Sequence, residues 1–221
     1  MSVSGPEQTD ADRVARLMQA VGNQYGMLQS ARGATIAESS SRSSLYLTTV
    51  TGAVVGLSFV AQASKFGESF FVFALAILPV VFFLGVVTYY RTLQTGVEDV
   101  IYARAISKIE KFYSEIDSAN ADLFHESTVD HVGLAGLGMF ALRWQQFLSA
   151  AAVVAVVNAV VGGVFVALAG GYALQVASPL PSIGAGAAAG ALIAFAFLRH
   201  QWATWMHVAR ALPMQRSGQQ T

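Results

Sequence analysis

Side chains that could line a water-filled path recur along the first long apolar segment of the chain. They follow one another at intervals of four, three, four, three and four residues, which places them on one face of a helix. This face, the polar stripe, consists of Ser44, Thr48, Thr51, Val55, Ser58 and Gln62. In one interpretation its hydroxyls and amide contact ions that cross a membrane, and Val55 forms a narrow apolar point. In the other, they hydrogen-bond across helices while Gly52 and Gly56 permit close packing, and the sequence leaves both open.

Small residues and one amide in the later apolar segments indicate helix packing. Gly186 and Gly190 are four residues apart, a spacing that lets two helix backbones touch. Asn158 is a lone amide in an apolar segment. An unpaired amide in hydrocarbon is costly, so we expect Asn158 to hydrogen-bond to a neighbouring helix.

Two groups of polar residues outside the apolar segments are candidate ligand sites. Guanidinium groups donate paired hydrogen bonds to phosphate, so four arginines could bind a phosphate-bearing ligand or could simply face solvent. They are Arg13, Arg16, Arg32 and Arg104. The segment from His125 to His131 could bind a divalent cation or form an acidic surface turn. It does not match a zinc-protease motif, because Val129 stands four residues after His125.

Catalytic motifs are missing from the sequence, so we expect a protein that is not an enzyme. No lysine follows a glycine and precedes Ser or Thr, as a phosphate loop requires, and there is no Gly-x-Ser-x-Gly elbow. The absence of cysteine excludes disulfides, thiolate metal sites and cysteine nucleophiles. Apart from Arg199 at the end of the last one, the apolar segments contain no Asp, Glu, Lys, Arg or His, which disfavours proton-coupled transport and carboxylate-pair proteolysis. We therefore expect no cofactor and no metal.

The apolar residues are concentrated in long blocks. Hydrophobic residues make up 54% of the 221 residues and charged residues 12%, and Trp144 to Leu198 contains no Asp, Glu, Lys or Arg. A helix needs about 20 apolar residues to cross a bilayer. The sequence thus predicts an all-α integral membrane protein with four transmembrane helices and cytoplasmic helical extensions. The expected spans, separated by a tight turn at 65–68 and a Gly- and Pro-rich break at 170–182, are 43–64, 69–90, 146–169 and 183–199.

Basic residues predict the orientation of these spans. Of the 13 Lys and Arg, only Lys65 lies in a loop on the opposite side from all the others. By the positive-inside rule, both termini and the central segment face the cytoplasm. The acidic, polar N-terminal segment does not resemble a secretory signal, so we expect the first apolar segment to be retained. The net charge of +0 gives no field that would attract nucleic acid, and we expect no sequence-specific nucleic-acid binding.

The remaining segments are expected to be helical in large part. The predicted organisation is an N-terminal amphipathic helix at 1–42, a transmembrane hairpin at 43–90, a cytoplasmic helical segment at 91–143, a second transmembrane pair at 144–199 and a cytoplasmic tail at 200–221. Apolar residues at helical spacing in 14–28 continue toward the first span. A second apolar ridge is expected at Leu93, Val97, Ile101, Ala105, Ile109, Phe112 and Ile116. Such ridges need a partner, which favours a homo-oligomer.

The order of these features supports a family resemblance. The chain contains SSRSSLYLTTVTGAVVGLSFVAQ, then a second span, then LGVVTYYRTLQTGVEDVIYARAISKIEKFY. Over residues 38–116 it resembles an uncharacterised family of actinobacterial four-pass membrane proteins and is more distantly similar to SLATT-type bacterial membrane effectors. It has one pair of spans more than the two-span SLATT plan. The resemblance implies an effector of the bacterial inner membrane that forms a pore in response to a cytoplasmic signal and arrests growth, as in anti-phage defence.

The sequence favours a homo-oligomeric ion channel of this type, whose partners are the lipid bilayer, further copies of itself, and a cytoplasmic nucleotide-type ligand or protein. The alternative is a non-conducting scaffold or accessory subunit that docks a cytoplasmic partner. The two hypotheses differ in subunit number, because only a pore requires several copies around an axis lined by residues 44–62. A membrane enzyme acting on lipid has no supporting group of residues.

Overall fold

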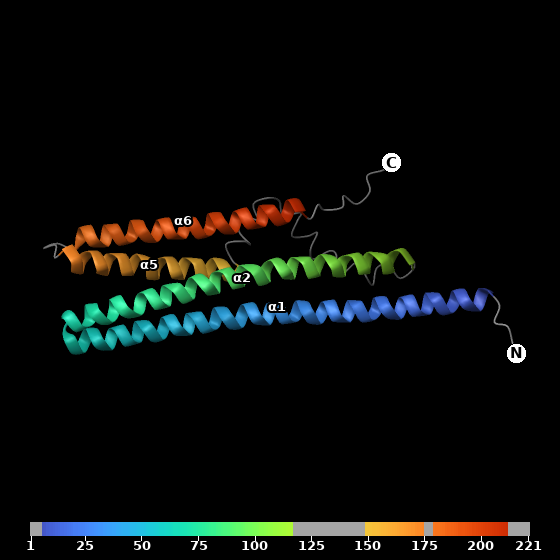
Figure 1. The fold of residues 1–221 in the computed structure, drawn as a ribbon, viewed down its shortest axis with the longest axis horizontal. Helices are drawn as coiled ribbons and strands as arrows, with labels where there is room; N and C mark the ends of the chain where they lie inside the picture. Colours follow the sequence, from blue (N-terminus) through green and yellow to red (C-terminus); the bar gives the residue numbers. More distant parts are fainter. Residues whose placement is uncertain (1–5, 117–148, 175–178, 212–221) are drawn as a thin grey trace. The chain divides into compact units, whose positions relative to one another are not determined.

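Four long helices form the described part of the chain. The computed structural model describes residues 6–116, 149–174 and 179–211, and within these ranges all regular secondary structure is α-helical. The helices are α1 (Pro6–Ser64), α2 (Glu68–Ile116), α5 (Ala150–Leu174) and α6 (Leu180–Ala211) (Figure 1). Each contains a stretch long and apolar enough to cross a membrane. The predicted all-α, multi-pass membrane architecture is confirmed.

The first two helices continue far beyond their apolar segments. Helix α1 runs for 59 residues and α2 for 49 residues, so each joins a polar, charged stretch to a membrane span without a break. A short turn at Lys65, Phe66 and Gly67 connects them, with positive φ angles of 51° at Lys65 and 59° at Phe66. The Gly67 N–H donates to the Ser64 carbonyl at 2.9 Å. A Cβ on Gly67 would lie 2.9 Å from that same oxygen, so this turn requires glycine.

The last two helices have different bounds from those predicted. Helix α5 passes through Gly170 and Gly171 and ends at Leu174, so the helix extends beyond the predicted span of 146–169. Glycine is tolerated here because in membrane helices it permits close helix contact, and a Cβ on Gly171 would touch Ser182 of α6. Helix α6 begins at Leu180, with Pro181 in the first turn, where the missing N–H breaks no hydrogen bond. It continues to Ala211, so much of the predicted tail is helix.

The described chain divides into two compact units, and each is described by itself. The charged unit contains residues 6–37 of α1 and 98–116 of α2. The apolar unit contains residues 38–97, together with α5 and α6. Its core includes the fully buried side chains Tyr46, Val81, Tyr89, Val154 and Asn158.

Close backbone contact joins α5 to α6 in the apolar unit. A Cβ on Gly163 would lie 2.7 Å from the Gly186 carbonyl oxygen and 3.2 Å from the Gly190 Cα. Helices in lipid gain little from the hydrophobic effect between themselves, so they associate through such tight packing of small residues. The predicted pair, Gly186 and Gly190, lies at this contact, and Gly163 completes it from α5.

Candidate functional site

The polar stripe lies on the outside of the apolar unit. All six of its side chains, from Ser44 to Gln62, are exposed in the described chain. The opposite side of α1 faces the core, where Tyr46 and Ala61 are buried and Val50 and Leu57 pack against them. Among the described residues, the stripe is therefore not used for packing.

Two hydroxyl groups of the stripe, those of Thr51 and Ser58, bond to their own helix. Thr51 Oγ1 donates to the Leu47 carbonyl at 2.9 Å, and Ser58 Oγ donates to the Val54 carbonyl at 2.8 Å. This local bond satisfies the O–H donor and leaves the oxygen lone pairs available as acceptors. The face can thus lie against lipid at little cost, or it can present acceptor oxygens to a cation or water.

The two glycines expected to support packing beside the stripe differ. Nothing in the described chain comes within 4 Å of a Cβ placed on Gly52, so this glycine is at no contact within the protomer. A Cβ on Gly56 would touch the Phe73 ring of α2 at 3.9 Å. Within the described ranges, the predicted packing role therefore has a partner for Gly56 and none for Gly52.

Asn158 is the centre of a three-helix polar contact. Its amide is fully buried, and its Oδ1 accepts a hydrogen bond of 3.1 Å from the Tyr46 hydroxyl of α1. A Cβ on Gly85 of α2 would overlap both Asn158 Oδ1 and the Tyr46 hydroxyl. Position 85 therefore has to be glycine for α2 to pack this closely against the two side chains. Among the described residues, Asn158 Nδ2 has no hydrogen-bond partner.

Sequence reasoning did not identify Tyr46 and Gly85 as parts of this contact. The available signal was that Tyr46 lies off the polar stripe, in an apolar segment, with a hydroxyl that needs a partner. Its partner Asn158 is 112 residues away in sequence. Only the folded arrangement of α1, α2 and α5 brings the three residues together.

The four candidate arginines do not form one phosphate site. Arg13 and Arg16 are exposed, and Arg16 Nε donates to the Asp12 carbonyl in its own helix at 3.2 Å. Arg32 pairs with Asp99 of α2 at 2.8 Å, and Arg104 is half-buried and also has a partner. Arg13 and Arg32 are 19 positions apart on one helix, or about 28 Å at 1.5 Å per residue. A single pocket built from all four is therefore excluded.

Polar contacts hold α1 to α2 in the charged unit. Besides the Arg32–Asp99 ion pair, the Tyr25 hydroxyl donates to Glu110 at 3.2 Å, and Gln29 donates to the same hydroxyl at 3.1 Å. Glu110 is buried, although the predicted apolar ridge of α2 left it out, whereas Ile101 on that ridge is 46% exposed. Five of the seven predicted ridge residues are buried or half-buried, with Leu93 in the core, and only Ile101 and Ile116 are exposed. Sequence pattern left out Glu110 because a carboxylate with a tyrosine donor can also face the partner helix.

Other candidates give no site in the described residues. No group of three or more His, Asp or Glu in the described ranges could hold a metal ion. His125, Glu126, Asp130 and His131 lie outside those ranges. In comparisons with known proteins, no family model matches the chain, and no curated protein or solved structure matches it significantly.

Proposed function

We propose that the protein is a homo-oligomeric membrane channel in which several copies of α1 line a conducting path with the polar stripe. The observation that carries this proposal is the exposure of all six stripe residues on a helix whose opposite side is packed into the core. No packing in the described part of the chain uses these side chains, so their regular placement needs another reason. A shared axis between copies gives one, because the stripe would then face water.

The chemistry of the stripe suits a weakly selective path. It carries hydroxyls and one amide but no charge, so it would offer acceptor oxygens without a strong preference for one ion. Val55, whose side chain is 48% exposed, would form the apolar constriction between Thr51 and Ser58. Such a constriction can close by losing its water.

The charged unit would carry the gate. In this proposal both termini and the charged unit face the cytoplasm of a bacterial cell, in agreement with the distribution of Lys and Arg. A phosphate-bearing ligand such as a nucleotide could compete with Asp99 for the Arg32 guanidinium and so loosen the contact between α1 and α2. The resemblance to SLATT-type effectors supports the same order of events, ending in depolarisation and growth arrest during anti-phage defence.

The test compares two threonines on the same helix. Thr51 lies on the stripe and Thr49 does not, yet both are exposed and both donate to the carbonyl four residues earlier at 2.9 Å. We expect purified protein in liposomes to conduct ions, Thr51→Leu to change the single-channel current, and Thr49→Leu to leave it unchanged. If both variants conduct the same single-channel current as the wild type, the polar stripe does not line the conducting path. Folded protein without conductance would reject the channel.

A specific observation favours a second candidate, a non-conducting scaffold that docks a partner protein. In the charged unit, Val14, Leu17, Met27 and Ile36 of α1 are each at least half exposed. Exposed apolar side chains on a polar helix indicate a binding surface. Either a partner protein or a second copy of the chain would bury them. Native mass spectrometry in mild detergent separates the two: the channel predicts three or more copies, and the scaffold predicts one copy or a heteromer.

A further inference from the structure

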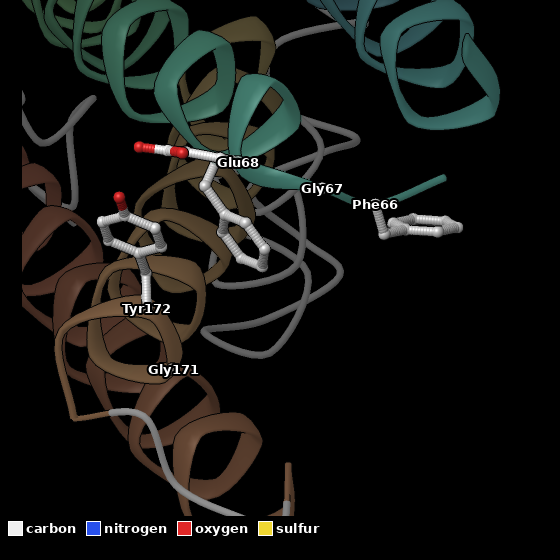
Figure 2. A pocket seen from close by; sticks show the side chains of 6 residues that line it. Phe66, Gly67, Glu68, Gly171 and Tyr172 are labelled. Atoms are coloured by element: carbon white, nitrogen blue, oxygen red, sulfur yellow. The ribbon is translucent and has the colours of Figure 1, made fainter. Parts of the chain in front are cut away.

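A cavity of about 380 Å³ lies in the apolar unit, beside the turn that joins α1 to α2. It is lined by Phe66, Gly67, Glu68, Phe71, Gly171 and Tyr172, from the turn, the start of α2 and the last turn of α5 (Figure 2). The turn separates two membrane spans, so the cavity is at a depth where lipid headgroups and water meet the protein. It is independent of the polar stripe.

Aromatic rings form the walls of this cavity. Phe71 and Tyr172 stack with ring centroids 5.2 Å apart, which ties α2 to α5. Phe70, which is buried, packs edge-on against Phe71 at 5.4 Å and against Phe66 at the same distance. Tyr172 is 41% exposed, so part of the ring surface stays open to a ligand. The neighbouring positions Gly67 and Gly171 add no side chain that would fill the space.

The charge of the cavity is negative. Of the six lining residues only Glu68 is charged, and its carboxylate extends to the same side as the Tyr172 hydroxyl (Figure 2). Among the described residues, no cation forms an ion pair with Glu68. An anion would be repelled here, and a lipid chain would leave the carboxylate without solvent. A metal ion would find one carboxylate and one neutral phenol oxygen among the lining side chains, fewer oxygen ligands than a hard cation takes.

We propose that this cavity binds an organic ammonium group, with the rings of Phe71 and Tyr172 as walls and the Glu68 carboxylate as counter-charge. Aromatic faces attract such cations, and the exposed Glu68 carboxylate beside them adds a Coulombic term that solvent weakens. The ammonium can belong to an amine-bearing phospholipid headgroup or to a soluble organic cation. The proposal goes beyond ion conduction and holds whether or not the protein is a channel.

The soluble source is tested with tetramethylammonium chloride and full-length protein in nanodiscs of phosphatidylglycerol. Saturation-transfer NMR should detect binding, and the thermal unfolding midpoint should rise to a plateau above that in NaCl of equal ionic strength. Glu68→Gln should weaken the apparent affinity by about tenfold or more. Glu98→Gln, the same change at another exposed position of α2, should not alter it. Tyr172→Leu should weaken binding, and Tyr172→Phe, which keeps the ring, should retain it.

The lipid source is tested with nanodiscs that also contain phosphatidylethanolamine. If this headgroup is the occupant, the lipid alone raises the unfolding midpoint of the wild type, tetramethylammonium adds little, and Glu68→Gln removes the lipid effect. The proposal is overturned if neither probe gives a saturable effect on folded wild-type protein. It is also overturned if Glu68→Gln and wild type respond equally to tetramethylammonium and to phosphatidylethanolamine. The aromatic residues would then serve only to anchor the protein at the membrane interface.

Discussion

The two sets of polar side chains in the apolar unit have opposite surroundings. Asn158 is fully buried, and its hydrogen bond with the Tyr46 hydroxyl connects α5 to α1. Helix α2 packs closely against this pair because position 85 has no side chain. The polar stripe on α1 is exposed, and in the described part of the chain the hydroxyls of Thr51 and Ser58 bond to the carbonyls of their own helix. One set therefore builds the fold and the other is free to serve a function. The predictions below test this division through the free energy of unfolding.

The largest loss of stability should follow from separating α5 and α6. In Gly163→Ala the new methyl group would lie 2.7 Å from the Gly186 carbonyl oxygen, which belongs to the backbone and cannot rotate away. Overpacking of this kind costs about 1–3 kcal/mol. We expect Gly163→Ala to lower the unfolding free energy in detergent by about 2 kcal/mol.

The matched control for this change is Gly170→Ala on the same helix. No atom of the described chain lies within 4 Å of a Cβ at Gly170, so this alanine should be neutral or stabilise the helix by up to about 1 kcal/mol. If both variants lose stability equally, the contact between Gly163 and Gly186 does not hold the two helices together.

A smaller loss of unfolding free energy should follow when the buried Asn158 amide loses the hydroxyl that donates to it. Tyr46→Phe keeps the ring and removes the hydroxyl that bonds to Asn158 Oδ1 at 3.1 Å. Interhelical hydrogen bonds in membrane proteins contribute about 0.6–1.7 kcal/mol, so we expect a loss of about 1 kcal/mol in the same unfolding measurement. Tyr172→Phe removes an exposed hydroxyl and serves as the control, with no change expected. A stable Tyr46→Phe variant would mean that packing alone holds Asn158.

Sequence patterns predicted the four helices better than they predicted how the helices pack against one another. Long charge-free runs predicted all four spans, because a bilayer imposes a length that composition reveals. The break between α5 and α6 lies within the predicted range 170–182, but α5 continues through Gly170 and Gly171 to Leu174, and of these two only Gly171 is at a contact with α6. Local preference treats glycine as a helix breaker, whereas close helix packing in a membrane favours it.

The candidate sites divide in the same way. Periodicity alone placed the polar stripe on one face of α1, but whether this face points inward or outward depends on where the other helices pack. The cavity beside the α1–α2 turn was not predicted, because Phe71 and Tyr172 lie about a hundred residues apart and each alone resembles an interfacial aromatic residue. Contacts between distant segments are absent from any local pattern.

The smallest effect on unfolding is expected at the stripe, where it is the most informative. Thr51→Val removes a hydroxyl that bonds only to Leu47 of its own helix and keeps the branched shape of an exposed side chain. We expect its unfolding free energy to stay within about 0.5 kcal/mol of the wild type at high dilution in detergent. If the stripe lies between copies, a loss should emerge as the protein concentration rises and the oligomer assembles, because only assembly gives Thr51 new neighbours. A loss of the same size at every concentration would instead place Thr51 among the residues that build the single chain, and the division between the two polar sets would fail.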